Sequence, residues 1–431
     1  MTSQPDTRRA GAGGGGHVHP DAGPLVPVEE HLALCLDAVA PLAPLEVALL
    51  EALDCVLVQD VTSSMDLPAF DNSSMDGYAV QVRDVAAASD EEPVVLPVVA
   101  DVPAGTREVL PLTAGSAVRI MTGAPVPPGT GAVVPVEWTD AGVAKVSIRR
   151  SAKEGQNIRR VGEDVTRGEL LLHAGTRVTP RHVAVLAATG HDRVRVHPKP
   201  RVVVLSTGSE IVEPGRAPGF GQIPDSNSYA LTAAVLDAGA IAYRVGVVED
   251  DAATVMSTLE DQLVRADVLV TTGGVSAGAY DTVKEVLSRL GTVRFQKVAM
   301  QPGMPQGFGT IGPDSTPIFT LPGNPVSAYV SFEVFVRPAL RKMLGETELH
   351  RPLVRARAAE GWRSSPGKAQ YSRVRLDVDA DGPVARPVGG PGSHLLADLS
   401  RADGLAVVPP EDTQVNVGDE VECMVLERGR R

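Results

Sequence analysis

The sequence predicts a multidomain α/β protein: a central parallel α/β domain, an N-terminal mixed domain with an inserted β module, and a small C-terminal β barrel. Three observations lead to this prediction. Between residues 199 and 345, β-branched runs alternate with helical patterns at βαβ spacing. Short apolar runs separated by Pro and Gly fill residues 66–155, which is typical of a small all-β module. After residue 345, β-rich segments with Gly-Pro turns indicate the barrel.

The N-terminal part begins with a Gly-rich polar segment, residues 1–25, which is expected to be a disordered tail. Helical patterning then runs from Val28 to Val58, broken by two prolines. Because proline is tolerated at a helix start, a second helix is expected over Leu45–Leu53. Arg181–Ala188, after Thr179-Pro180, has the pattern of a capped helix.

Residues 26–65 and 156–198 flank the β module and are expected to form one N-terminal mixed domain around it. The strands expected in the module are Val94–Val99, Ala117–Met121, Ala132–Glu137 and Val143–Arg149. The strands expected in the barrel, residues 346–431, are Val354–Ala358, Ser372–Val378, Ala406–Val408 and Val421–Leu426.

Three segments of the α/β domain share one design: a buried strand, a glycine turn and a following polar or helical segment. They are 201–211 (RVVVLSTGSEI), 267–290 (DVLVTTGGVSAGAYDTVKEVLSRL) and 317–340. In the second segment Val283, Val286, Leu287 and Leu290 recur at helical spacing. Unpaired N–H groups at a helix start, with glycine beside them, can seat an anion. If the strands are neighbours in a parallel sheet, the three loops line one crevice. The alternative is that each glycine merely permits a tight turn.

Length and composition exclude several classes of protein. At 431 residues the chain is too long for one core, and about two to four domains are expected. A net charge of −13 and an aromatic content of 3% disfavour nucleic-acid binding. No apolar run approaches the roughly 18 residues of a membrane span, and no signal peptide is expected. The three isolated cysteines match neither a disulfide framework nor a zinc site, which favours the cytoplasm.

Acidic side chains gather at the predicted strand ends: Glu210, Asp225, the run 249–251 and Asp281. Mg²⁺ prefers oxygen ligands and often lies between carboxylates and substrate phosphates. Each position has an alternative, because Asp225 and Asp281 could cap helices and the run 249–251 is interpreted as a solvated loop. For Glu210 and Asp281 we favour a functional role.

Three further segments carry unusual concentrations of polar side chains: 68–80 (PAFDNSSMDGYAV), 119–128 (RIMTGAPVPP) and 156–164 (QNIRRVGED). A turn at Asp76-Gly77 explains only two residues of the first segment. The third places two arginines beside Glu163 and Asp164. Arginine pairs bind phosphate or carboxylate well, and a local ion pair is an equally good interpretation.

The motifs SSMDGYAV, MTGAPVP, RRVGED, STGSE, TTGGVSAGAYD and LPGNPVSA, in this order, resemble those of the molybdopterin molybdotransferase family, which includes bacterial MoeA and the gephyrin E domain. The resemblance extends from about residue 26 to about residue 428. It implies four domains and an elongated homodimer, with a site between the α/β domain of one subunit and the β module of the other. It also implies a transferase that converts adenylyl-molybdopterin and molybdate, with Mg²⁺, into molybdenum cofactor and AMP.

The resemblance also implies roles for single residues. Glu210, Asp281 and Asp76 would be catalytic, and the first two would bind Mg²⁺ and the nucleotide. The phosphate or pterin would be held by Thr207, Gly208, Gly273, Gly274 and Ser276. Asp76 and Thr122 would come from the other subunit, while Asp164 and Asp225 would support the site. The expected molybdate contacts are Lys297, Ser327, Arg373 and Ser393. Cleaving a pyrophosphate beside a cation depends mostly on positioning and charge stabilisation.

One stretch departs from the family pattern. Where the family commonly has Lys-Pro-Gly-Lys-Pro, this chain has Gln301-Pro302-Gly303-Met304-Pro305, so both lysines are replaced. Losing a partly buried cation near a dianion is expected to weaken binding by about 1 kcal/mol or more per charge.

Two other functions stay open at this point. One is the adenylylating step of the same synthesis, since a relative that performs it shares the α/β domain. The β module and the barrel argue against this function, because that relative would not need them. The other is a non-catalytic pterin-binding scaffold, which the loss of the two lysines favours. Clustered carboxylates at Asp76, Glu210 and Asp281 favour an enzyme, because a scaffold has no reason to bury them.

Overall fold

The computed structural model describes residues 24–249, 251–273, 286–287 and 291–426. The chain divides into two compact units. Unit 1 comprises Met1–Ala40, Pro200–Met343 and Glu348–Arg431, and unit 2 comprises Pro41–Lys199 and Leu344–Thr347. No helix among the described residues is long and apolar enough to cross a membrane. The domain boundaries predicted above stay a prediction.

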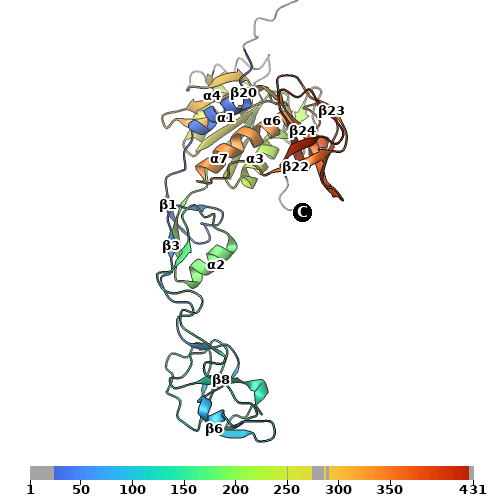
Figure 1. Cartoon of the computed structure of the whole chain (residues 1–431). Helices are drawn as coiled ribbons and strands as arrows, with labels where there is room; N and C mark the ends of the chain where they lie inside the picture. Colours follow the sequence, from blue (N-terminus) through green and yellow to red (C-terminus); the bar gives the residue numbers. More distant parts are fainter. Residues whose placement is uncertain (1–23, 250, 274–285, 288–290, 427–431) are drawn as a thin grey trace, which may run out of the picture. The chain divides into compact units, whose positions relative to one another are not determined.

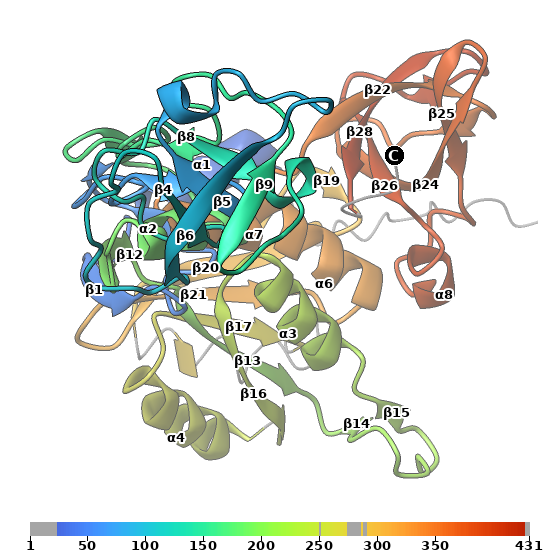
Figure 2. The same ribbon diagram turned by 90° about the horizontal axis from the view of Figure 1, so that it is seen from below.

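A six-stranded sheet forms the centre of unit 1 (Figure 2). Its strands, in spatial order, are β16 (Ile241–Val248), β13 (Arg201–Thr207), β17 (Val268–Thr272), β21 (Thr316–Leu321), β20 (Pro305–Ile311) and β18 (Arg294–Lys297). The first four run parallel, β20 runs antiparallel to β21, and β18 pairs antiparallel with β20 and so runs in the same direction as the first four. The predicted parallel sheet is thus correct for four strands only. The short connections between β18, β20 and β21 leave no room for a crossover, and they allow only antiparallel pairing.

The faces of this sheet are covered because its strands are apolar on both sides. Val203 and Leu205 of β13 pack against Val255 and Leu259 of α4 (Ala252–Leu263). The alternate residues of β13 point to the opposite face and are also buried. The other helical segments of this part are α3 (Asn227–Asp237), α6 (Pro325–Ser331), a π-helical turn (Phe332–Val336) and α7 (Arg337–Met343). The helix predicted after residue 283 lies largely outside the described residues, within which 286–287 are helical and buried.

Helix α1 (Val28–Asp37) packs on the α/β domain of unit 1 (Figure 1). His31 is buried, with its Nδ1 3.1 Å from Gln296 Oε1 and its ring 4.8 Å from that of Phe335. The Lys342 ammonium donates to the carbonyl of Leu36 at 2.8 Å. These contacts are long-range in sequence, so helical periodicity alone did not reveal them.

The C-terminal part of unit 1 is the small barrel that the sequence predicts. Its strand order closes on itself because β24 pairs with both β25 and β26. The five strands are β22 (Leu353–Ala358), β24 (Ala369–Asp379), β25 (Gly382–Pro387), β26 (Gly404–Val408) and β28 (Glu420–Val425). Strand β25 was not predicted. Shorter elements of unit 1 are β14 (Ile211–Val212), β15 (Ile223–Pro224), β19 (Met300–Gln301), β23 (Trp362–Arg363), α8 (Leu396–Leu399) and β27 (Gln414–Val415).

Unit 2 contains the predicted β module as a five-stranded sheet. In spatial order its strands are β8 (Ala132–Pro135), β5 (Gly77–Val80), β7 (Ala117–Ile120), β6 (Val94–Val102) and β9 (Lys145–Ile148), with 3-10 turns at Val82–Val85 and Val136–Trp138. Two ribbons pair the chain entering the module with the chain leaving it. They are β3 (Val61–Thr62) with β11 (Leu170–Leu172), and β4 (Asn72–Ser73) with β10 (Ile158–Arg159).

The rest of unit 2 is a three-stranded sheet, β1 (Leu45–Ala48), β12 (Arg193–His197) and β2 (Val56–Leu57), with helix α2 (Pro180–Ala188). The capped helix predicted at Arg181–Ala188 is confirmed, and the Thr179 backbone N–H donates to His182 Nδ1 at 3.2 Å. The helix predicted over Leu45–Leu53 is wrong. Its first four residues pair along their whole length with β12, a partner about 150 positions away that the local pattern does not reveal.

Candidate active site

The carboxyl ends of β13, β17 and β21 lie side by side, since these three strands are neighbours in the sheet. The described parts of the three glycine loops therefore meet at one edge, as predicted. A cavity of about 600 Å³ lies there, and its lining includes Glu210, Asn227, Gly273, Asn324 and His394. Three residues of the predicted site, Gly274, Ser276 and Asp281, lie outside the described residues.

Gly273 lies against the end of β13 too closely for any side chain. A Cβ atom at this position would be 2.2 Å from the Thr207 carbonyl oxygen, and the backbone has φ +91°. Glycine is therefore required here for two reasons: a Cβ atom would clash with Thr207, and the positive φ disfavours other residues. The Thr207 hydroxyl, beside this contact, is buried and has no hydrogen-bond partner in the described part of the chain. A bound phosphate could supply the hydrogen-bond acceptor that this buried hydroxyl lacks.

Asp225 joins the end of β13 to the start of α3. Its carboxylate accepts hydrogen bonds from the Ser206 hydroxyl at 3.0 Å, from the Ser228 N–H at 3.0 Å and from the Ser228 hydroxyl. Arg244 Nη1 lies 3.6 Å away. The side chain is almost fully buried. Asp225 thus caps helix α3 through the Ser228 N–H, which is the alternative role considered for it in the sequence analysis. Its hydrogen bonds also hold the wall of the cavity in place.

Arg244 is a positioning residue that the sequence pattern did not reveal. Its guanidinium binds Glu213 through two hydrogen bonds of 3.0 and 2.9 Å and stacks over the Tyr229 ring at 4.2 Å. The hydrogen bonds from Arg244 lower the pKa of the Glu213 carboxyl. No sequence signal identifies Arg244, because it stands in the middle of a strand.

Asn227 is a second missed residue, and it connects two of the loops. Its Nδ2 donates to Thr272 Oγ1 at 3.0 Å and to the Gly323 carbonyl at 2.7 Å. Thr272 in turn donates to the Pro322 carbonyl at 3.0 Å. The position of Asn227 directly after Asp225-Ser226, at a predicted loop, was the available signal.

Glu210 is exposed at the cavity rim, with its carboxylate next to Gly208: a Cβ at Gly208 would be 2.8 Å from Glu210 Oε2. No cluster of three or more His, Cys, Asp or Glu side chains that could hold a metal occurs among the described residues. Mg²⁺ is usually held by only one or two carboxylates together with substrate phosphates and water. Glu210 is one such carboxylate, at the rim of a cavity of about 600 Å³.

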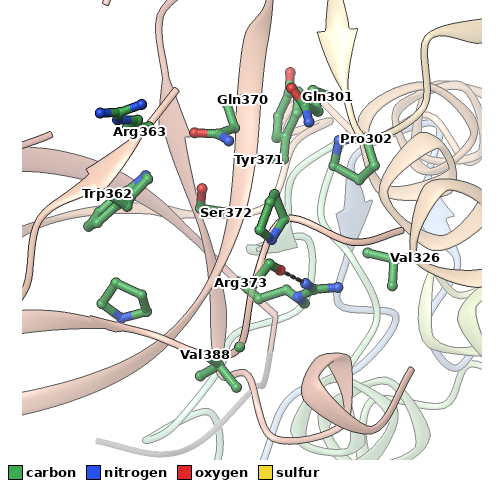
Figure 3. Close-up of a pocket in the computed structure, with 14 residues that line it drawn as sticks. Gln301, Pro302, Val326, Trp362, Arg363, Gln370, Tyr371, Ser372, Arg373 and Val388 are labelled. Atoms are coloured by element: carbon green, nitrogen blue, oxygen red, sulfur yellow. Dashed lines mark hydrogen bonds between the residues drawn. The ribbon is translucent and has the colours of Figure 1, made fainter. Parts of the chain in front are cut away.

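A second cavity, of about 190 Å³, lies in unit 1 and is lined by residues of the barrel and by Gln301, Pro302 and Val326 (Figure 3). Arg373 borders it and donates to the carbonyls of Gly392, at 3.0 Å, and of Gly390. Burial lowers the pKa of the Arg373 guanidinium, partly offset by Asp398. Gln301, one of the two lysine replacements, is hydrogen-bonded through its Oε1 to the Ser365 hydroxyl.

Of the other predicted molybdate contacts, two serines lie near the second cavity and Lys297 does not. Ser327 is buried in the first turn of α6, and the Ser393 carbonyl accepts from the Val326 N–H at 3.0 Å, so these two serines are near the second cavity. Lys297 is exposed at the end of β18 and lines neither cavity. The Met304 carbonyl accepts from the Val298 N–H at 2.7 Å.

Unit 2 brings together two residues of the predicted site. The Asp76 carboxylate accepts from the Thr122 N–H at 2.7 Å and from the Thr122 hydroxyl at 2.9 Å. These bonds, the backbone one first, lower the pKa of Asp76. Asp164 is exposed, and its N–H donates to the Leu67 carbonyl at 3.0 Å.

The local ion pair considered for the RRVGED segment has a different partner. Arg160 Nη1 lies 2.7 Å from Asp71 Oδ2, in the PAFDNSSMDGYAV segment, and Glu163 accepts from the Arg160 backbone N–H. The β4–β10 ribbon brings these segments together, so the pair crosses between two motifs instead of lying within one.

Comparisons with known proteins cover almost the whole chain. Residues 26–190 match the MoeA N-terminal region (domain I and II), residues 203–342 a probable molybdopterin binding domain, and residues 355–426 the MoeA C-terminal region (domain IV). Two proteins of Mycobacterium tuberculosis (strain ATCC 25618 / H37Rv) are similar. Molybdopterin molybdenumtransferase 2 is 46% identical, over 93% of this chain and 99% of that protein. Molybdopterin molybdenumtransferase 1 is 41% identical, over 92% and 98%.

Solved structures agree with the sequence comparison. Crystal structures of molybdopterin biosynthesis MoeA proteins from Pyrococcus horikoshii have TM-scores of 0.75 and 0.70 to this structure, at 32% and 30% sequence identity. Each alignment covers 93% of this chain, and 99% or 100% of the other.

Proposed function

Because the chain belongs to the molybdopterin molybdenumtransferase family and is therefore a transferase of molybdenum cofactor biosynthesis, we propose that its specific reaction is Mg²⁺-dependent insertion of molybdate into adenylyl-molybdopterin, with release of AMP. The observation that carries this proposal is the cavity at the carboxyl ends of β13, β17 and β21, with Glu210 and Gly273 in its lining and Thr207 directly behind Gly273. Ligands of open α/β sheets bind at this edge.

The residues around the larger cavity would position the nucleotide part of the substrate. The unpartnered Thr207 hydroxyl can donate to a phosphate oxygen, and Gly208 and Gly273 leave space for the phosphate to approach. Asp225 and Asn227 hold the surrounding loops through buried hydrogen bonds, so the cavity keeps its shape before substrate binds. We assign the remaining phosphate contacts to Gly274 and Ser276.

Glu210 and Asp281 would hold the Mg²⁺ ion, which supplies positive charge that neutralises the phosphate oxygens at the bond to be broken. The support for Glu210 is its exposed carboxylate at the cavity rim. For Asp281 the support is its place in the TTGGVSAGAYD motif.

The smaller cavity is the proposed molybdate site. Arg373 is held by three backbone carbonyls, those of Gly390, Gly392 and Leu395, which accept from Nη1 and Nη2. A guanidinium has five N–H donors, so Nε and one Nη2 hydrogen remain for an oxyanion. Ser327 and Ser393 are the proposed neighbours, and Lys297 would add long-range attraction from its exposed position.

We further propose a cytoplasmic homodimer in which Asp76 and Thr122 of one subunit, supported by Asp164, complete the site of the other. Three free, buried cysteines fit a reducing compartment. The dimer is testable by mixing two inactive variants, Asp76→Asn and Glu210→Gln, under subunit exchange. Mixed dimers then contain one complete site, and about a quarter of wild-type activity should return. No recovery after verified exchange would contradict a shared site.

The reaction itself is tested by titrating molybdate into purified protein with adenylyl-molybdopterin and Mg²⁺ and measuring AMP. We expect saturable, molybdate-dependent release that Glu210→Gln abolishes. Tight binding of adenylyl-molybdopterin without molybdate-dependent AMP release would reject the transferase reaction and favour a pterin-binding protein.

A further inference from the structure

The barrel end of the smaller cavity contains polar groups that the proposed molybdate site does not use. Among the described residues, Trp362 Nε1 and Gln370 Oε1 are both buried and without a hydrogen-bond partner. Both residues line the cavity, and Gln370 is only 5% exposed. Figure 3 shows Trp362 and Gln370 at one end of the cavity and Arg373 beside Val326 at the other. Native proteins rarely leave a buried donor and a buried acceptor unpaired.

The size of the cavity argues against a single bridging water as the missing partner. Its volume is about 190 Å³, whereas about 10–15 Å³ on the same measure is enough to hold one water. The lining of the cavity also includes the apolar side chains of Trp362, Pro387, Val388 and Pro391. Apolar side chains with a few placed polar groups are typical of a small-molecule site, and the Trp362 indole offers a flat face against which a planar ring can stack.

The polar groups also define what kind of ring fits. Trp362 can only donate, and the unpartnered Gln370 oxygen can only accept. An oxyanion such as molybdate has no proton to offer Gln370 and is repelled by its oxygen. A heterocycle with an amide-like edge has a donor and an acceptor side by side, as the 2-amino-4-oxo edge of a pterin does.

We propose that this end of the cavity binds the pterin ring of the substrate, with Gln370 accepting from the pterin N3–H or 2-amino group and Trp362 donating to a ring acceptor. The proposal rests on the proposed function, whose substrate carries a pterin, and assigns that ring to the barrel. The pterin edge and the molybdate contacts around Arg373 then occupy opposite ends of one cavity.

Binding can be measured through Trp362 itself. The chain has two tryptophans, so a Trp138→Phe background leaves Trp362 as the sole indole. Trp138 lies in a 3-10 turn of unit 2. Free pterin should quench the Trp362 fluorescence of the full-length protein saturably, while molybdate or AMP alone should not. Quenching by molybdate with none by pterin would overturn the proposal.

Two variants test the hydrogen bonds. Gln370→Met keeps the length of the side chain and removes the acceptor, and we expect the affinity for pterin to fall about tenfold. Gln414→Met is the matched control, because the Gln414 side chain is exposed in β27, outside the cavity lining, and bonds Asn416. Trp362→Phe, followed by calorimetry, keeps a flat wall and removes the donor. Unchanged pterin affinity in both Gln370→Met and Trp362→Phe would reject the assignment.

The same variants separate this proposal from the proposed function. With adenylyl-molybdopterin, Gln370→Met should raise KM about tenfold and leave kcat nearly unchanged, as expected for an interaction equal in ground and transition states. Wild-type AMP release together with an unchanged KM in Gln370→Met would reject the pterin site alone. Pterin binding to Trp362 without any AMP release would reject the reaction alone. Gln370→Met should also be at least as stable as wild type, which a purely structural role would not allow.

Discussion

Thr122 donates two hydrogen bonds to Asp76, one from its backbone N–H at 2.7 Å and one from its hydroxyl at 2.9 Å, across 46 positions of sequence. The pairing of β5 with β7 places the two residues together. Both belong to motifs singled out in the sequence, and neither motif alone indicates the contact. The carboxylate of Asp76 is thereby held ionised and oriented at an exposed position.

The Asp76–Thr122 pair predicts separable effects on activity and on pKa. Asp76→Asn should lower kcat by about 10²- to 10⁴-fold if Asp76 takes part in proton transfer. Thr122→Val removes only the hydroxyl bond, so the pKa of Asp76 should rise part of the way toward its usual value, measured by NMR titration. The depressed pKa means that the bonds persist above it and are lost as pH falls through it. Thr122→Ser is the control, and an unshifted Asp76 in Thr122→Val would contradict this account.

Gly273→Ala should damage the larger cavity for a steric reason. The new Cβ would be 2.2 Å from the Thr207 carbonyl, at φ +91°. Gly215 has the same φ of +91°, but a Cβ added there would meet no atom within 4 Å, so Gly215→Ala carries the conformational cost alone. That cost is about 1 kcal/mol or more. We expect Gly273→Ala to be less stable than Gly215→Ala in urea unfolding and to raise KM for adenylyl-molybdopterin. Equal effects would show that the contact with Thr207 is unimportant.

Gln301→Lys should restore part of the attraction for molybdate. One partly buried cation is worth about 1 kcal/mol, which corresponds to roughly fivefold in KM. The gain should shrink as salt is added, because screening weakens it. Gln301→Met is the control, since both variants lose the bond to Ser365 and only one gains a charge. If Gln301→Lys and Gln301→Met have the same KM for molybdate, a positive charge at position 301 adds nothing to the binding that Arg373 provides.

Glu333→Gln should be strongly destabilising. The Glu333 carboxylate is fully buried and accepts from Arg337 Nε at 2.7 Å and from Arg351 at 2.9 and 3.0 Å. Removing one partner of a buried ionic cluster typically costs about 3–5 kcal/mol. Asp237→Asn acts on the same arginines from a carboxylate that is 44% exposed. Its cost in chemical unfolding should be clearly smaller, because solvent screens the exposed pair. A larger loss for Asp237→Asn would reverse this ranking.

His31 should make unit 1 sensitive to mild acid. Burial lowers the pKa of His31, partly offset by the hydrogen bond with Gln296. Below the unfolded-state value near about 6.5 the unfolded chain binds a proton that the folded chain does not. Stability is therefore complete above that pH and falls as pH decreases toward the folded pKa, by at most about 1.4 kcal/mol per pH unit.

The check on His31 is the pH dependence of the unfolding free energy in His31→Gln. The slope due to this residue should disappear, although the variant is less stable overall because a buried contact is lost. His173→Gln is the control, since the His173 side chain is 75% exposed. An unchanged slope in His31→Gln would show that His31 is not the responsible group.

Local patterns in the sequence predict the α/β domain, the inserted β module and the closed barrel. They also place the glycine loops after 207, 272 and 321 at one sheet edge. These features depend on local rules, namely periodicity of apolar residues and glycine at turns, which are readable over a few neighbouring positions. Motifs such as SSMDGYAV and TTGGVSAGAYD identified the family for the same reason, because each is a contiguous string.

Contacts between groups that are distant in sequence become visible only in the folded chain. Asp225 with Arg244, Asn227 with Gly323, and Arg160 with Asp71 are contacts between segments that the sheet and ribbons bring together. Leu45–Ala48 is a strand because β12 pairs with it, and α1 belongs to unit 1 because Phe335 and Gln296 enclose His31. Pairing and burial are properties of two surfaces at once, and one stretch of sequence carries information about only one of them.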